Sequence, residues 1–200
     1  MSASGEIERR YSQDRAMVDR SDGRRVRGNA IVFNSLSIVM VNRGIGRFRE
    51  RIRPDAVDRT MRSGAAVKAL WNHNSDLVLG NTRAGTLLLR KTASALAIEI
   101  TPPLWADPQL ETIQRGDVDG MSFSFSVPDG GDTWEFNTED GIPIRDVADM
   151  TFSEVSVVAF PAYGATDVAV SQRSIEAFAE HHGKHTRKYW EDQHRSRLAL

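Results

Sequence analysis

One stretch limits the fold more than any other, because its side chains alternate strictly between hydroxyl and apolar groups. It runs from Gly120 to Val127 with the sequence GMSFSFSV. Strict alternation is typical of a β-strand, since successive side chains point to opposite faces of a sheet. We expect a half-buried strand with its phenylalanines and valine facing the core. The opposite face then carries Ser122, Ser124 and Ser126, and a nucleophilic serine among them would need a base from another segment.

Composition excludes several classes of protein. The chain has 200 residues, which is enough for one domain with a sizeable core. A formal net charge of −1 offers no basic surface, so we expect neither nucleic acid nor a membrane as a partner. The absence of cysteine excludes disulfides, thiolate catalysis and cysteine-ligated zinc. No apolar stretch resembles a secretory signal or a membrane span, so we expect a soluble protein that stays where it is made.

Strand-like runs separated by turn signals fill most of the chain. Helices are expected at residues 53–64, with Val57 and Met61 facing the core, and at residues 107–115, with Leu110 and Ile113 on one face. Many strands with few helices predict a mainly β (α+β) fold, either a barrel or a sandwich flanked by helices. The expected strands cover residues 26–33, 48–52, 67–71, 77–79, 86–90, 95–101, 133–136, 142–147 and 152–160.

Changes in composition divide the chain into three parts. Residues 1–25 are expected to be a flexible N-terminal segment, disordered up to about Ile7 and with an edge strand after it. Residues 26–170 are expected to form the folded domain. Residues 171–200 are expected to form a C-terminal helix, at residues 174–181, followed by a basic, histidine-rich tail.

Two residues of the folded region are candidate catalytic partners for a serine. His73 is the one histidine that precedes the tail, and it follows an apolar strand, where a rigid scaffold meets an open loop. Glu154 lies in a β-branched, apolar run, where a carboxylate is either solvent-exposed or buried with a partner. A serine, a histidine and an acid on three strands are compatible with a catalytic triad. A structural histidine and an exposed glutamate explain the same pattern.

Metal chemistry is the remote alternative. The tail histidines His181, His182 and His185 have a spacing that could hold a metal on a helix, and a metal-dependent hydrolase would combine them with His73. No matched carboxylates lie close to them in the sequence. We therefore expect no metal and no cofactor.

Several motifs, taken in order, resemble the prohead (capsid maturation) proteases of HK97-like tailed phages. The resemblance extends over about residues 26–165. Its motifs are Gly28 to Asn34, Phe48 to Pro54, Asn72-His73-Asn74 with Leu79-Gly80, Gly120-Met121-Ser122-Phe123, Glu154 to Val158, and Phe160-Pro161-Ala162-Tyr163.

The resemblance implies a fold and a set of roles. The fold would be an assemblin-like β-barrel flanked by helices, and the activity that of a serine endopeptidase acting through an acyl-enzyme. His73 matches the family's base, Ser122 its nucleophile and Glu154 the third member of the triad, with Asp146 and Asp149 as nearby competitors. Many members have glycine where this chain has Ser124. Backbone amides of residues 81–85 are a guess for the oxyanion hole.

The resemblance also implies a biological setting. The protease would act inside the prohead, in the host cell cytoplasm, on the scaffolding segment of the major capsid protein and on itself. The portal protein and a second copy of the chain are further expected partners. The tail at residues 171–200 would be a self-cleaved or encapsidation segment, or an ordinary flexible terminus. The alternative is a catalytically silent scaffold or assembly protein on the same fold.

Overall fold

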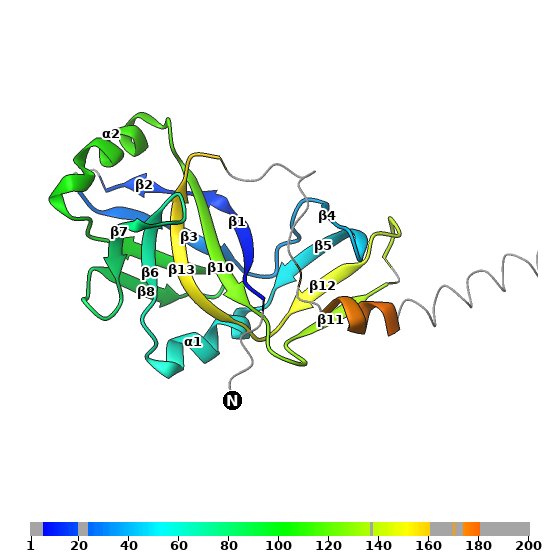
Figure 1. The fold of residues 1–200 in the computed structure, drawn as a ribbon. Coiled ribbons are helices and arrows are strands. Elements are labelled where there is room, and N and C mark those ends of the chain that lie inside the picture. The colour runs from blue at the N-terminus through cyan, green and yellow to red at the C-terminus, as the bar shows by residue number, and fades with distance from the viewer. Residues whose placement is uncertain (1–5, 20–23, 137, 161–169, 171–173, 181–200) are drawn as a thin grey trace, which may run out of the picture.

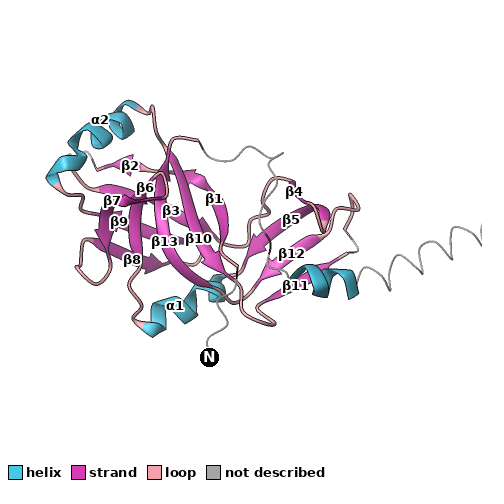
Figure 2. Ribbon diagram, in the orientation of Figure 1, coloured by secondary structure: helices cyan, strands magenta, loops and turns pink. Residues whose placement is uncertain are grey.

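Strands make up most of the chain that the structure describes, which comprises residues 6–19, 24–136, 138–160, 170 and 174–180. The structure is a computed structural model, and its strands form three sheets (Figure 1). The short helices lie around the outside of the strands (Figure 2). The mainly β (α+β) class expected from the sequence is therefore confirmed.

The largest sheet has five strands, and the serine-rich strand lies inside it. β10 is flanked by the edge strand β1 on one side and by β13 on the other, both antiparallel to it. β13 pairs in parallel with β6, which forms a hairpin with β7. In spatial order the strands are β1 (Glu8–Arg15), β10 (Gly120–Ser126), β13 (Thr151–Val158), β6 (Lys68–Trp71) and β7 (Asn74–Asn81).

A second sheet packs against the first and closes the main core. Its residues Ile31, Leu96 and Ile98 belong to the same apolar cluster as Phe123 and Val155 of the first sheet. Its last two strands in sequence, at residues 87–91 and 95–100, form an antiparallel hairpin. In spatial order the strands are β2 (Met17–Val18), β3 (Val26–Val32), β9 (Ala95–Ile100) and β8 (Leu87–Lys91).

A third sheet stands beside the other two, on the right of Figure 1. It has its own small apolar cluster around Met40, Phe48 and Val170. The helical residues 174–180 pack on it through Phe178, whose ring lies 4.9 Å from that of Trp134. In spatial order the strands are β11 (Asp132–Glu135), β12 (Ile144–Val147), β5 (Gly46–Ile52) and β4 (Met40–Asn42).

The expected barrel is wrong. A barrel requires its first and last strands to hydrogen-bond to each other, but the described strands form open sheets. The five-stranded sheet ends at β1 and β7. β1 meets the second sheet through a side chain, since Ser12 Oγ donates to the carbonyl oxygen of Asn29 at 2.7 Å, and not through a ladder of backbone bonds. The architecture is a sandwich with an added third sheet.

Both expected helical segments are present. Residues 53–64 contain η1 (Pro54–Val57) and α1 (Asp58–Ser63), and residues 104–115 contain η2 (Leu104–Ala106) and α2 (Asp107–Arg115). One expected detail is wrong: Met61 is 38% exposed, and Thr60 is buried beside Val57. The change from a 3₁₀ to an α-helical turn at Val57 rotates the next residues, so a helical period counted through both segments points to the wrong face.

The N-terminal segment is more ordered than its composition indicates. The edge strand expected after Ile7 is present as β1, and the expected flexible segment at residues 1–25 does not extend over residues 8–18. Residues 1–5 and 20–23 lie outside the described residues, as do residues 181–200 of the expected tail.

A buried ionic network explains why β1 is held in place. Arg145 of β12 is fully buried and donates to Glu8 of β1 at 2.6 and 3.0 Å, to Glu50 of β5 at 2.9 Å and to Asp132 of β11 at 2.5 Å. Arg10 of β1 donates to the same Glu50 at 2.8 and 3.0 Å. Burial alone would raise the pKa of Glu50, but Arg10 and Arg145 outweigh it and lower that pKa. The network therefore ties the first strand to the third sheet.

We predict that Arg145→Met lowers the free energy of unfolding by about 3–5 kcal/mol at pH 7, because it removes the guanidinium that pairs with Asp132 and leaves buried Glu8 and Glu50 with Arg10 alone. The loss should shrink on acidification. Since the folded-state pKa of Glu50 is lowered, its stabilising contribution is complete above its ordinary value of 4.5 and disappears as the pH falls below it. Denaturant titration of both proteins measures the difference.

The matched control is Arg62→Ala, which removes an exposed pair with Asp58 and should cost less than about 1 kcal/mol. Equal effects of the two substitutions would show that the buried network contributes nothing specific.

Candidate active site

A tight turn presents His73 at the end of β6. Asn72 and His73 are the two residues between Trp71 and Asn74, which pair across the β6–β7 hairpin. Both have positive φ, 50° and 58°, as two-residue hairpin turns of the I′ class require. Asparagine tolerates this conformation well, whereas histidine adopts it less often. Strain of this kind is a recurrent feature of functional sites.

Hydrogen bonds tie this turn to the end of β13. The N–H of Asn72 donates to the carbonyl oxygen of Val157 at 2.9 Å. The side-chain oxygen of Asn72 accepts from the N–H of Ala159 at 2.9 Å. The sequence pattern did not reveal this turn, although its signal, an asparagine within a two-residue gap between strand runs, is present. The consequence is that the His73 ring is anchored next to β13.

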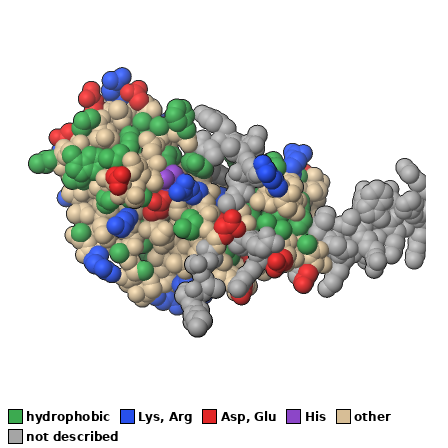
Figure 3. All heavy atoms as spheres, in the orientation of Figure 1, with side chains coloured by type: hydrophobic (Ala, Val, Ile, Leu, Met, Phe, Trp, Pro, Cys, Tyr) green, Lys and Arg blue, Asp and Glu red, His purple; other side chains and the backbone are tan. Residues whose placement is uncertain are grey.

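The structure brings His73 and Glu154 together. Nδ1 of His73 contacts Oε1 of Glu154, which lies on β13. The two side chains are 11% and 13% exposed, so solvent reaches only a small part of each. A histidine is present on the face drawn in Figure 3, beside charged side chains. Nε2, the second ring nitrogen, is buried and has no hydrogen-bond partner among the described residues. A histidine held in this way can offer Nε2 as a base.

Glu154 stays ionised in this setting. Burial alone would raise the pKa of Glu154, but the hydrogen bonds from His73 and from the Ser124 hydroxyl outweigh it and lower that pKa, with a contribution from the charge of Arg9. Ser124 Oγ donates to Oε1 at 2.7 Å. An ionised carboxylate can hold the imidazole in one orientation and stabilise its protonated form.

Ser122 lies on the same face as these groups but is not bonded to them. In the register of β10 and β13, Ser122 is opposite Ser156 and Ser124 is opposite Glu154, which places all four side chains on one face. Ser122 is fully buried, and its Oγ donates to the carbonyl oxygen of Arg10 at 2.8 Å. The structure therefore places the serine near the histidine–carboxylate pair without a hydrogen bond to His73.

Tyr11 helps to cover this face. It lies opposite Ser122 on β1, and its ring is 6.5 Å from that of His73 in an edge-to-face arrangement. Tyr11 lies on β1 and His73 follows β6, and these two strands are three inter-strand spacings apart, or about 14 Å. Both side chains must therefore lean over the serines between them. This corrects the expectation of a half-buried strand, because Ser122 and Ser124 are as buried as the phenylalanines on the other face.

The two competing acids are engaged elsewhere. Asp146 accepts from Arg51 at 2.6 and 2.7 Å and pairs with Arg53 at 3.0 Å. Asp149 accepts hydrogen bonds from Nε and Nη2 of Arg59. Neither contacts His73 in the structure. Of the three acids considered, Glu154 is the one that the histidine meets.

The backbone amides of residues 81–85 do not suit an oxyanion hole. Those of Asn81, Thr82, Arg83 and Gly85 all donate to acceptors within or beside their own turn. The turn also lies at the opposite end of β7 from His73, roughly 23 Å away along the strand. The structure does not support the expectation that these amides form the oxyanion hole.

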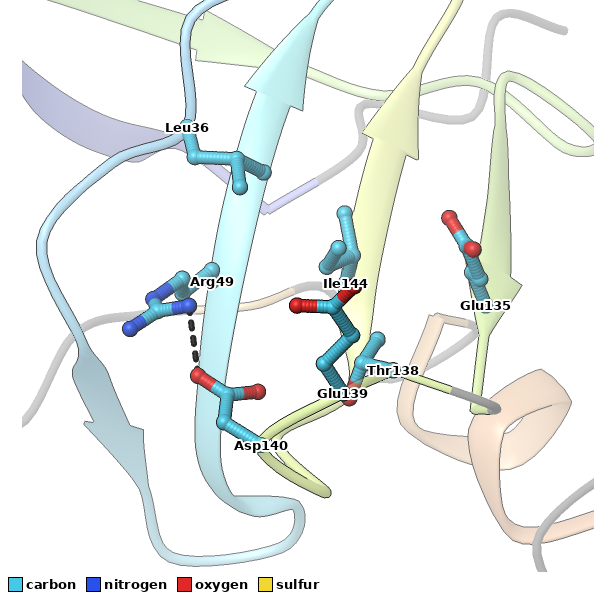
Figure 4. A pocket seen from close by; sticks show the side chains of 7 residues that line it. All are labelled: Leu36, Arg49, Glu135, Thr138, Glu139, Asp140 and Ile144. Atoms are coloured by element: carbon cyan, nitrogen blue, oxygen red, sulfur yellow. Dashed lines mark ion pairs between the residues drawn. The ribbon is translucent and has the colours of Figure 1, made fainter.

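Other features of the surface do not compete with this site. One pocket of about 330 Å³ lies on the third sheet and contains the ion pair of Arg49 with Asp140, at 2.6 Å (Figure 4). Its lining includes neither His73 nor Glu154, and none of the serines of β10. The part of the chain that the structure describes contains no group of three or more potential metal ligands, and no helix long and apolar enough to cross a bilayer. The tail histidines lie outside it.

A histidine held by a carboxylate is one of the two contacts that make up the catalytic triad of serine hydrolases. The family model for the caudovirus prohead serine protease matches residues 12–181. The chain therefore belongs to this family of phage serine proteases of capsid maturation, as its motifs indicated. No curated protein and no solved structure matches the chain.

We predict a downfield imidazole N–H resonance from His73, because its Nδ1 proton is shared with an ionised carboxylate. Proton NMR of protein labelled with ¹⁵N-histidine detects it. The resonance should disappear in Glu154→Gln and persist in Asp146→Asn, whose carboxylate meets arginines. Its survival in Glu154→Gln would mean that the contact seen here does not form in solution.

Proposed function

We propose that this protein is the serine endopeptidase that cleaves the scaffolding segment of the major capsid protein, and itself, inside the assembling prohead in the host cell. The observation that carries the proposal is the contact of His73 with Glu154 on the face that bears Ser122. Membership of the prohead protease family supports the substrate class. Contact with the portal protein and a cleavable tail at residues 171–200 belong to the same proposal.

The mechanism is acyl transfer, with Ser122 as nucleophile, His73 as base and then acid, and Glu154 as the group that stabilises the imidazolium. His73 Nε2 removes the proton of Ser122 while Oγ attacks the peptide carbonyl, and Glu154 stabilises the imidazolium that forms. The imidazolium then gives the proton to the leaving amine. The acyl-enzyme is hydrolysed by a water molecule that His73 deprotonates in turn, which returns Ser122 to its starting state.

Two movements must precede this reaction. The Ser122 hydroxyl donates to the carbonyl oxygen of Arg10, so it has to leave this acceptor before its proton can reach Nε2. Within the part of the chain that the structure describes, Nε2 has no other partner to give up. Because Ser122 is fully buried, a substrate must also displace part of the cover, which includes Tyr11.

This burial of Ser122 and its hydrogen bond to Arg10 in place of His73 favour the alternative, a catalytically silent assembly protein on this fold. The two functions differ in the reactivity of Ser122, because only the protease activates this serine towards electrophiles.

We predict that a fluorophosphonate probe forms an adduct on Ser122 of the wild-type protein, and that Ser122→Ala and His73→Ala abolish it. Mass spectrometry of the labelled peptide identifies the site. Ser126→Ala, on the same strand but without a role in the proposed chemistry, is the matched control and should label like wild type.

Co-expression with the capsid subunit separates the two functions if the isolated protein does not label. Wild-type protein should trim the subunit, and Ser122→Ala should not. Wild-type protein that leaves the subunit intact while proheads assemble would rule out the protease.

We also predict that Glu154→Gln slows labelling of Ser122 by about 10³- to 10⁴-fold, because an amide no longer stabilises the imidazolium. Asp146→Asn and Asp149→Asn should change the rate by less than about threefold, since their carboxylates pair with arginines. The measurement is the second-order rate constant of labelling. A larger loss in either aspartate variant than in Glu154→Gln would move the third role to that aspartate.

A further inference from the structure

We propose that Ser124 is a positioning residue whose hydroxyl fixes the Glu154 carboxylate in the orientation that meets His73. The inference rests on the proposed function. It starts from one observation: Ser124 Oγ donates at 2.7 Å to Oε1 of Glu154, the same oxygen that contacts Nδ1 of His73.

The backbone places Ser124 for this contact. Ser124 and Glu154 are directly opposite each other in the β10–β13 ladder. The next pair along is Phe125 with Phe152, so Ser153 is an extra residue in β13, a β-bulge immediately beside Glu154. Bulges next to functional sites commonly redirect a neighbouring side chain. Here the bulge ends the regular pairing at the residue that carries the carboxylate.

The hydroxyl supplies a constraint that the glutamate lacks. The terminal torsion of a glutamate side chain has broad, shallow minima, so the carboxylate can turn without meeting a steep barrier. A second donor on Oε1 opposes that rotation and keeps this oxygen directed at His73. Ser124 is 3% exposed, so water has little access to replace its hydroxyl.

Electrostatics agree with the geometry. The hydrogen bond from Ser124 is one of the interactions that lower the pKa of Glu154 against the effect of burial. Without it, the carboxylate would keep its proton to a higher pH. Since only the ionised carboxylate can stabilise the imidazolium, labelling at acidic pH should fall further when this hydrogen bond is absent.

The test compares Ser124→Ala, Ser124→Gly and Ser124→Thr with wild type, in the full chain. Ala and Gly remove the hydroxyl, whereas Thr keeps it. The rate of fluorophosphonate labelling of Ser122 should fall about tenfold in the Ala and Gly variants, with a further fall at acidic pH. Ser124→Thr should recover most of the rate, and the control Ser126→Ala should match wild type in rate and in pH profile.

A second measurement does not depend on catalysis. Exchange of the His73 Nδ1 proton with water, followed by NMR, should be severalfold faster in Ser124→Ala than in wild type and close to wild type in Ser124→Thr. A wild-type protein that neither labels nor trims the capsid subunit would defeat the proposed function, and this measurement would still decide the role of Ser124.

Two results would overturn the inference. One is a Ser124→Ala protein that is folded by circular dichroism and shows both the wild-type pH profile and the wild-type proton exchange. The other is a folded Ser124→Thr protein as slow as Ser124→Ala, which would show that side-chain volume matters and the hydroxyl does not.

Discussion

The antiparallel pairing of β10 with β13 is the constraint on which the rest of the site depends. A single register puts Ser122 opposite Ser156 and Ser124 opposite Glu154. Because side chains alternate between faces, a slip of one residue would send every hydroxyl into the apolar core and the phenylalanines to the polar face. The stacked pair of Phe123 and Phe125, with rings 5.3 Å apart, therefore helps to fix the polar face as well as the core.

Around this pairing, the other elements bring polar groups over a surface that would otherwise face solvent. The turn at Asn72 and His73 is bonded to the end of β13, and Tyr11 reaches over from β1 on the opposite side. The resulting low exposure strengthens the interaction of His73 with Glu154, since water screens buried charges less. Ser122 is held by a hydrogen bond to the backbone of β1. The contacts that order the site therefore also limit the access of a substrate to it.

Local patterns in the sequence predicted the elements well and their surroundings less well. Helix α2 was found within its predicted bounds, because its start and end are local features, such as Gly116 at φ 80° after its last residue. The open sheets and the burial of Glu8 depend on partners far along the chain, which periodicity does not report. For the site, motif resemblance selected His73, Ser122 and Glu154. The structure adds the contact between His73 and Glu154, the bond of Ser122 to Arg10, and the bond of Ser124 to Glu154.

The buried ionic network can form only late in translation, because its residues lie far apart in the sequence. Glu8 is made early, but its partner Arg145 follows 137 residues later. At a translation rate of about 5–20 residues per second, roughly 7–27 s pass before the cation is made. During most of that interval β1 lacks β10 as well, since the neighbouring strand begins at Gly120. The nascent chain thus leaves the ribosome with its first strand unpaired, and the hydroxyl face can be assembled only once β13 has been translated.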